Sequence, residues 1–209
     1  ASDVYKRQTM NRVASGRPRK FDEVAVLDLA MNSFWRGGFH GTSYDDLEKA
    51  TGLRRQSLIY AFGDKRTMFD KVIAHYISAR VEGLVAILDD PRTPAPDRIQ
   101  AAFKQWIADA SVEDQRGCLV VNTIAELGGN DADVSAKLEE ATVRLRAGFA
   151  RCLRAGQAEG TISRELDPNA LAALAVAAGD GAMLHSRVSA DVTAMSSALA
   201  AFLQMIRAL

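Results

Sequence analysis

The stretch "ATGLRRQSLIYAFGDK", residues 50–65, places three long polar side chains directly before a short apolar segment. Leu58 and Phe62 stand four residues apart, so they share one face of a helix with about 3.6 residues per turn. Arg55 and Gln56 then lie on the opposite face. A helix this short is unstable alone because nucleation is costly, so its apolar face must dock on a core. The docked helix would present its polar face rigidly.

Two segments before this stretch complete a pattern of three helices. The apolar stripe over 21–36 predicts the first helix, which a Gly-Gly pair ends. Thr42 begins the second helix, and Asp45 three residues later resembles the acidic partner of a capping box. Gly52 supplies the turn to the third helix, predicted over about 54–62. Three short helices with a Gly turn between the last two predict a helix-turn-helix.

The polar residue types of the third helix suit contacts with DNA. Arginine reads guanine bidentately, glutamine reads adenine, and the major groove of DNA admits a helix. A serine hydroxyl and a lysine ammonium suit phosphate oxygens. In isolation, the run Arg-Arg-Gln is more typical of a solvated helix start. The helix-turn-helix context instead favours a DNA-reading face, whose side chains are Arg54, Arg55, Gln56, Ser57, Tyr60 and Lys65.

From about residue 21 to residue 76, the sequence resembles the TetR/AcrR family of bacterial regulators. The resembling positions include the Thr-Ser pair that begins at Thr42, the turn residue Gly52, and Phe62 followed by Lys65. Because many positions agree in order and spacing, the resemblance is specific. It extends the set of expected DNA-contacting residues to Thr42.

Two positions depart from the family pattern. A Tyr usually follows the Leu of the third helix, whereas Ile59 stands here with Tyr60 next. The phosphate contact usually made by that Tyr is therefore not carried over. Arg54 replaces the usual Ser or Thr cap. This replacement favours either a direct phosphate contact or a frayed first turn.

The resemblance implies a function as well as a fold. Family members are typically homodimers in which each subunit places its third helix in the major groove. A ligand pocket in the C-terminal domain controls the spacing of the two DNA-binding domains. The resemblance therefore implies a repressor that a small-molecule effector, largely apolar, releases from double-stranded operator DNA.

The charge distribution agrees with a DNA-binding N-terminal third. The chain has no formal net charge, yet residues 1–66 hold 12 Lys and Arg against 8 Asp and Glu. The segment "GRPRK" carries Arg17, Arg19 and Lys20, and such an arm can enter a minor groove or contact phosphates. The alternative is a disordered polar tail. We expect residues 1–20 to form a leader and basic arm, disordered in part.

The rest of the chain reads as helical, and no convincing strand or repeat is present. Proline-rich "DDPRTPAPD" and the segment "GTISRELDP" are expected loops. The fold class is therefore all-α with about nine helices: a DNA-binding domain over 21–66 and a ligand-binding and dimerisation domain over 67–209. The six helices expected after the helix-turn-helix cover about 65–88, 97–110, 118–128, 131–159, 168–186 and 191–208.

Several residues of the C-terminal part are candidates for a ligand pocket. Phe103, Trp106 and Phe149 are more often core residues, but apolar pockets use the same side chains. Asn122 is polar within an apolar stripe, and either a ligand or a backbone group could satisfy it. For a second polar pair, Asp180 and His185, a bond between subunits is as reasonable as a ligand contact. The expected ligand-binding set is Phe103, Trp106, Cys118, Asn122, Phe149 and His185.

The last two helices, 168–186 and 191–208, are rich in alanine and predict a two-fold dimer contact. Two cysteines make no disulfide framework and lack metal-ligand spacing, so no metal or cofactor is expected. No apolar run approaches a membrane span of about 18 residues. Without a secretory leader, a cytoplasmic location is the default.

Two other classes of function remain as alternatives to a DNA-binding regulator. A helical bundle can be an enzyme, but the sequence contains no common catalytic motif and no Glu-x-x-His pair for a di-iron site. A protein-interaction module that has lost DNA binding is the second alternative. The presence of Arg55, Gln56 and Lys65 argues against it.

Overall fold

The computed structural model describes residues 21–110, 116–189 and 192–207, and this part of the chain is helical apart from loops and one isolated bridge between Ile162 and Arg207. The prediction of an all-α fold is confirmed. The described residues form ten α-helices, two of which are parts of one continuous rod. Counted with that rod as a single helix, the described residues hold nine helices, as predicted. The basic arm lies outside the described residues.

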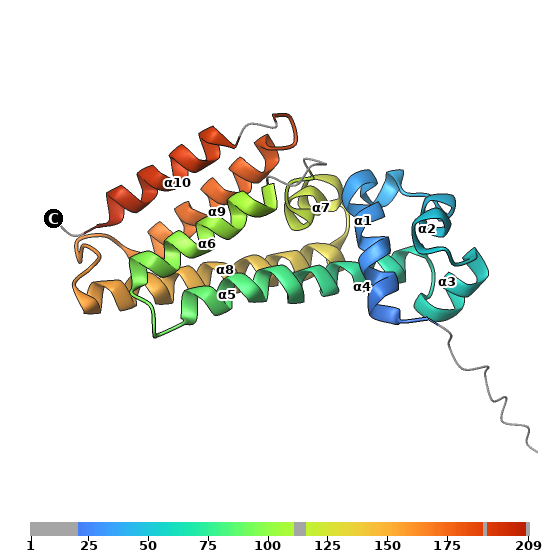
Figure 1. Ribbon diagram of the computed structural model, residues 1–209, viewed down its shortest axis with the longest axis horizontal. Helices are drawn as coiled ribbons and strands as arrows, with labels where there is room; N and C mark the ends of the chain where they lie inside the picture. The colour runs from blue at the N-terminus through green and yellow to red at the C-terminus, as the bar shows by residue number, and fades with distance from the viewer. Residues whose placement is uncertain (1–20, 111–115, 190–191, 208–209) are drawn as a thin grey trace, which may run out of the picture.

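Helices α1 (Glu23–Gly41), α2 (Tyr44–Thr51) and α3 (Arg55–Phe62) form one end of the molecule, which we call the head (Figure 1). Phe34, Leu47, Leu58 and Phe62 are all buried, as the spacing of the apolar residues predicted. The predicted end of the first helix at the Gly pair is correct only in part. Gly38 has φ 71° and ψ −178°, which kinks the chain, and one further helical turn follows it.

The cap of α2 differs from the prediction by one residue. Ser43, not Thr42, is the N-cap, and its hydroxyl accepts a hydrogen bond from the backbone N–H of Asp46 at 3.2 Å. The Asp46 carboxylate accepts the Ser43 backbone N–H in return, which completes a capping box shifted by one position from the predicted Thr42–Asp45 pair. Thr42 is buried instead.

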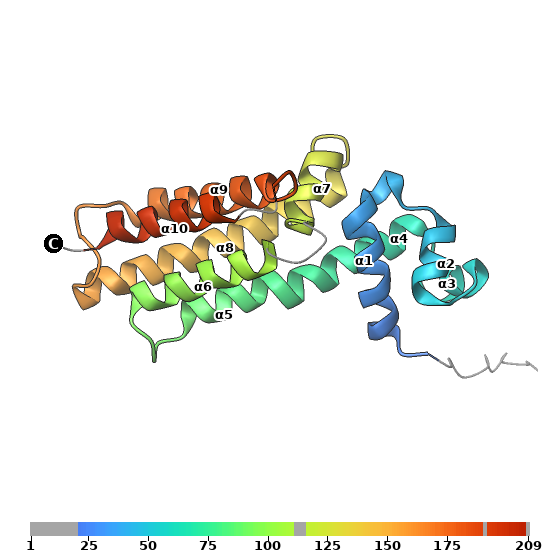
Figure 2. The same cartoon turned by 45° about the horizontal axis from the view of Figure 1, so that its top comes forward.

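A long rod joins the head to the rest of the molecule. It consists of α4 (Lys65–Tyr76), a π-helical segment (Ile77–Val81) and α5 (Glu82–Asp89) (Figure 2). The predicted helix over 65–88 is therefore confirmed, but the π-helical segment was not predicted. Because α4 packs against α1, with the rings of Phe34 and Phe69 5.0 Å apart, the predicted domain boundary after residue 66 falls within this rod.

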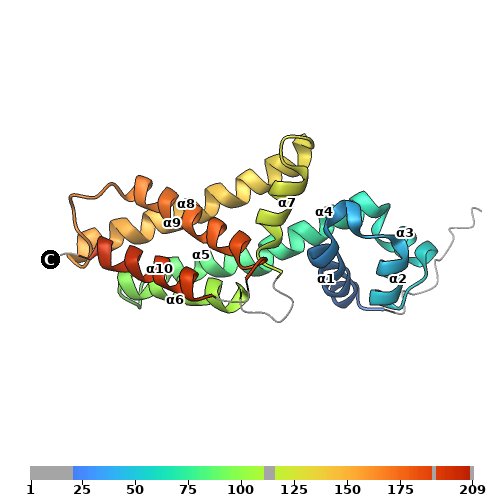
Figure 3. The same cartoon turned by 90° about the horizontal axis from the view of Figure 1, so that it is seen from above.

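The remaining helices form a C-terminal bundle together with α5. They are α6 (Ala95–Ala110), α7 (Leu119–Leu127), α8 (Ala132–Glu159), α9 (Pro168–His185) and α10 (Thr193–Ile206). The long helix α8 contacts α5, α6 and α9, while α7 lies next to the head and contacts α1. Helices α9 and α10 lie side by side along one face of the bundle (Figures 1 and 3).

Candidate nucleic-acid interface

The candidate interface is the outer face of α3, at the far end of the head. Leu58 is completely buried, which docks this eight-residue helix on the head. Tyr60 is 76% exposed, and it shares the solvent side of the helix with the predicted polar residues. Exposed side chains of α3 and its N-cap are Arg54, Arg55, Gln56, Ser57, Ile59 and Tyr60.

Two residues of α2 organise the start of α3. Arg54 is the N-cap and makes no side-chain capping bond, as the missing Ser or Thr predicted. The Glu48 carboxylate instead accepts the backbone N–H of Arg55. The Arg55 guanidinium lies 4.3 Å from the centre of the Tyr44 ring, a cation–π contact that orients it. Sequence reasoning missed Glu48 and Tyr44 because neither belongs to the third helix.

Lys65 has partners within the chain. Its Nζ donates hydrogen bonds to the carbonyl oxygens of Phe39 at 2.9 Å and Thr42 at 3.0 Å. It also lies 4.6 Å from the centre of the Phe39 ring. These contacts use two of the three ammonium donors and join the end of α1 to the start of α4. This structural role of Lys65 was not predicted, and the phosphate contact expected of it stays a prediction.

We therefore expect Lys65→Ala to lower the stability of the head more than a surface change does. Removing a charged donor from two carbonyl groups costs about 1–3 kcal/mol, or roughly 2–10 °C in the midpoint of thermal unfolding. Lys104→Ala, on the exposed side of α6, is the matched control. Unchanged thermal stability together with a flatter salt dependence of DNA binding would instead favour the phosphate contact.

Thr42 does not belong to the candidate interface. It is 2% exposed, and its hydroxyl donates to the carbonyl oxygens of Gly38 at 2.6 Å and Ser33 at 3.2 Å. The expectation that its side chain contacts DNA is therefore wrong for this conformation. The hydroxyl bonds instead to carbonyl groups on both sides of α1's last turns, which joins the end of α1 to the start of α2.

Helix α7 holds the kinked end of α1. The Glu126 carboxylate accepts the backbone N–H groups of Phe39 at 2.8 Å and His40 at 2.7 Å. These are the amides that follow the kink at Gly38, so a side chain of the bundle caps the last turn of α1. The position of the head is therefore tied to the position of α7.

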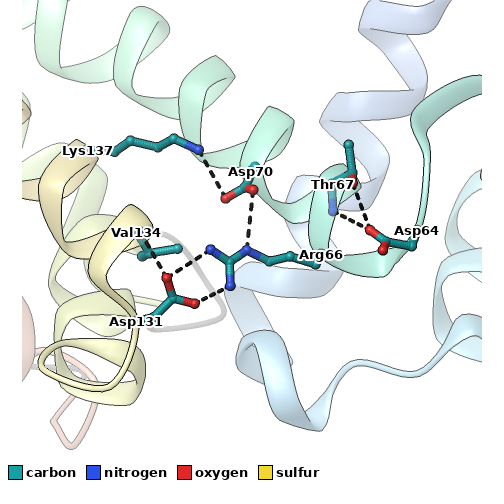
Figure 4. Close-up of polar contacts among 7 residues, drawn as sticks. All are labelled: Asp64, Arg66, Thr67, Asp70, Asp131, Val134 and Lys137. Atoms are coloured by element: carbon teal, nitrogen blue, oxygen red, sulfur yellow. Dashed lines mark hydrogen bonds and ion pairs between the residues drawn. The ribbon is translucent and has the colours of Figure 1, made fainter.

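A second junction joins the rod to the start of α8 (Figure 4). The Arg66 guanidinium makes a bidentate contact with the Asp131 carboxylate, and its Nε is 3.3 Å from Asp70. Lys137 of α8 is 3.3 Å from the other Asp70 oxygen. Asp131 also caps α8 by accepting the backbone N–H of Val134. Hydrogen bonds from Arg66 are the main cause that lowers the pKa of the Asp131 carboxyl.

The bundle contains a small internal cavity of about 40 Å³. Trp106 and Cys118, two of the predicted ligand-binding residues, line it. Burial raises the pKa of the Cys118 thiol, and Tyr76 Oη donates to its sulfur at 3.5 Å. The thiol is therefore protonated at neutral pH, which does not favour a reactive cysteine.

Four other predicted ligand residues lie elsewhere. Phe103 and Phe149 are core residues, with ring centres 5.9 Å apart, and do not line the cavity. The Asn122 amide donates to the carbonyl oxygen of Arg116 at 2.8 Å and accepts from Arg187 at 3.2 Å. His185 is exposed beside the surface groove between α9 and α10. None of these four residues lines the internal cavity, and their role in ligand binding stays a prediction.

Two family models match the chain. The model for bacterial regulatory proteins of the tetR family covers residues 26–72. The model for the tetracyclin repressor-like C-terminal domain covers residues 95–202, more than half of the chain. The chain belongs to the TetR family. The resemblance inferred from the helix-turn-helix residues is therefore confirmed, and the second match extends it to the bundle.

Curated TetR-family relatives agree with this assignment. The chain is 28% identical over 181 residues to the HTH-type transcriptional repressor ComR of Escherichia coli K12, which covers 81% of this chain and 85% of ComR. It is 28% identical over 159 residues to the uncharacterized HTH-type transcriptional regulator YezE of Bacillus subtilis, covering 75% and 81% of the two chains.

Solved TetR-family structures share the fold. A TetR family transcriptional regulator, CifR, complexed with 26bp double-strand operator DNA superposes with a TM-score of 0.79 at 26% identity, over 91% of this chain and 100% of the other. The regulatory protein TetR from Rhodobacter sphaeroides gives a TM-score of 0.80 at 21% identity, over 87% and 97%. The chain is therefore a DNA-binding transcriptional regulator by family, fold and relatives.

The described residues lack two kinds of feature. No helix among them is long and apolar enough to cross a membrane. The same residues contain no group of three or more His, Cys, Asp or Glu side chains placed to hold a metal ion.

Proposed function

We propose that the chain represses transcription as a two-fold dimer that inserts α3 of each subunit into the major groove of operator DNA. The observation that carries this proposal is the outer face of α3, where Arg55 and Gln56 are exposed on a helix fixed to the head by Leu58. Arg55 is the candidate reader of a guanine and Gln56 of an adenine. Arg54, Ser57 and Tyr60 are candidate phosphate contacts.

The basic arm is proposed to add contacts outside the major groove. Arg17, Arg19 and Lys20 precede α1, whose first turn belongs to the head. A basic segment in this position can follow the DNA backbone or enter a minor groove.

An experiment on DNA tests the proposed repressor directly. Genomic fragments that the full-length chain retains are selected in vitro and sequenced. We expect an inverted repeat, because a two-fold dimer presents two equivalent reading helices. Recovery of no shared sequence would contradict the proposed function.

The proposed dimer contact is the outer face of α9 and α10 (Figure 3). Ala172, Ala175 and Gly179 face the core, so part of the alanine content serves packing within the subunit. The remaining stripe of small and apolar side chains is exposed, and an exposed apolar stripe of this kind is typical of an interface. The stripe consists of Ala173, Leu174, Ala177, Gly181, Leu184, Ala194, Ala198, Ala201 and Met205.

We expect light scattering to give a dimer at micromolar concentration and Leu184→Lys to give a monomer. A lysine within an apolar contact leaves a charge buried without a partner. Val143→Lys on α8 is the matched control, because Val143 is 47% exposed and Leu184 is 46% exposed. A monomeric wild-type chain would contradict the proposed dimer, and a dimeric Leu184→Lys variant would contradict the assigned contact.

The proposed effector site is the internal cavity, since it adjoins the rod that reaches the head. Tyr76, Arg80, Val81 and Leu84 line the cavity from the rod. The Tyr76 ring also meets the Trp35 ring of α1 edge-on, 5.0 Å from its centre. An effector that enlarges the cavity would displace Tyr76 and with it the head. A preference of 1–3 kcal/mol for the displaced state lowers operator affinity about 5- to 150-fold.

A further inference from the structure

We infer that the internal cavity binds an organic cation, a small apolar molecule carrying a protonated amine, with the Asp180 carboxylate as its counter-ion. The inference rests on the proposed function only where it gives this molecule the role of effector. The binding itself follows from the chemistry of the cavity wall.

The cavity wall is largely apolar, yet α9 contributes a carboxylate to it. Asp180 lines the cavity together with Trp106, Val120 and Met183. No other described residue makes a hydrogen bond or ion pair with this carboxylate. Burying a charge is costly unless an opposite charge or hydrogen-bond donors compensate it. Because Asp180 is only partly exposed, a cation bound in the cavity would stabilise its ionised carboxylate.

The other charged groups of the cavity wall compensate one another. Arg80 Nη1 lies 2.8 Å from Asp109 Oδ1, and Gln105 donates to the same oxygen at 3.1 Å. Tyr76 Oη donates to Cys118, whose thiol is neutral. The charges of Arg80 and Asp109 cancel each other. The ionised Asp180 carboxylate therefore gives the wall a net negative charge. That charge attracts a cation and repels a carboxylate ligand.

The aromatic side chains complete a binding site for a cation. The faces of tryptophan and tyrosine rings attract ammonium groups within about 6 Å of the ring centre. Gly179 allows α9 to approach Trp106 closely, because a Cβ at this position would come within 2.5 Å of the Trp106 ring. Asp180 follows Gly179 on α9, and both Asp180 and Trp106 line the cavity. An amine in the cavity would therefore meet a carboxylate and an aromatic side chain.

The size of the cavity links ligand binding to the rod. A volume of about 40 Å³ holds only a few water molecules. A molecule larger than a short alkylamine therefore has to move part of the wall outward. The rod residues Tyr76, Arg80 and Val81 belong to this wall at the π-helical segment, which already departs from regular α-helix. Such segments occur frequently at functional sites.

The protonation of Asp180 makes the binding dependent on pH. Burial raises the pKa of Asp180 to about 6, so the empty cavity holds a carboxylate above that pH and a neutral acid below it. Cation binding should therefore weaken as the pH falls through about 6. The titratable groups that face the cavity are Tyr76 and Arg80 of the rod, Asp109 of α6, Cys118 before α7, and Asp180 of α9. Burial also raises the pKa of Asp109. A substitution of Asp180 alone is therefore needed to assign the pH dependence to Asp180.

Calorimetric titration of the full-length chain without DNA tests the inference. The probes are ethylammonium and 2-phenylethylammonium, with 2-phenylethanol and 3-phenylpropionate as neutral and anionic counterparts. A charge-assisted contact of about 1.5–3 kcal/mol predicts that an ammonium ion binds roughly 10- to 150-fold more tightly than the alcohol. Asp180→Asn should abolish that advantage. Equal binding of cation and alcohol, unchanged binding in Asp180→Asn, or no ammonium binding at millimolar concentration would each overturn it.

Two further measurements separate the possible causes of a negative result. Asp180→Asn removes a carboxylate that is costly to bury, so its thermal midpoint should exceed that of the wild type at pH 7–8. Because the folded pKa is raised to about 6 from an ordinary value of 3.8, this advantage should shrink as the pH falls below 6. It should vanish below about pH 3, where the carboxyl is largely neutral in the unfolded chain as well. A lower midpoint at pH 7 would show a structural role instead. Operator binding is measured separately: ammonium binding through Asp180 without any effect on operator affinity would leave the inference standing and refute the effector role.

Discussion

Replacing Arg55 and Gln56 together by alanine is expected to weaken operator binding of the full-length chain by at least about 30-fold, since each lost base contact costs about 1–3 kcal/mol. The two side chains are exposed and neighbouring on α3, and Arg55 is oriented by the Tyr44 ring. Fluorescence anisotropy with the selected operator measures the loss. Each single variant should also relax the base preference at one position of each half-site.

The control for this double variant is Arg92→Ala with Gln100→Ala. Both residues are exposed, and they lie in or near the loop between α5 and α6, at the far end of the rod from the head. The control removes the same charge and the same amide, so a general electrostatic effect would weaken both proteins equally. If the α3 variant bound as tightly as the control, α3 would not be the reading helix.

Gly38→Ala is expected to lower the thermal midpoint by about 5–15 °C, since two costs combine. Gly38 has φ 71° and ψ −178°, a conformation that only glycine adopts readily and that costs other residues about 1–3 kcal/mol. An added Cβ would also lie 2.6 Å from a Glu126 carboxylate oxygen. The carboxylate would have to leave the amides of Phe39 and His40 that it caps.

Gly41→Ala provides the control for this prediction within the same helix. Gly41 has no positive φ, and a Cβ there would meet nothing within 4 Å. Glu126→Gln tests the loss of the carboxylate cap alone, because it keeps the shape of the side chain and removes the charge. Equal stability of Gly38→Ala and Gly41→Ala would show that the kink is not constrained.

Local patterns in the sequence predicted the helices and the exposed face of α3. The spacing of Leu58 and Phe62 was enough to assign the buried side of α3, because the face of a helix depends only on positions along one segment. Gly52 was recognised as the turn, and it adopts φ 69° as the C-cap of α2. The same reasoning placed the capping box one residue too early, because Thr42 and Ser43 are both good caps.

Contacts between distant segments could not be predicted in this way. Lys65 looked available for a phosphate, yet its ammonium binds carbonyl groups of residues more than twenty positions earlier. Glu126 caps amides 86 and 87 residues away, and no local pattern marks it. Apolar spacing also does not distinguish a core from a pocket. Phe103 and Phe149 fill the core, whereas Tyr76 and Asp180 line the cavity.

The central claim is that two α3 faces, held at a fixed spacing by a dimer, read two half-sites of one operator. Inserting five base pairs between the half-sites of the selected operator tests it most directly, because half-sites lie about one DNA turn of 10–10.5 base pairs, or a multiple of it, apart. Half a turn moves one half-site to the opposite side of the duplex. We expect two chains on the original operator and an affinity loss of at least about 100-fold after the insertion, close to non-specific binding. Unchanged affinity, or one chain per operator, would contradict the claim.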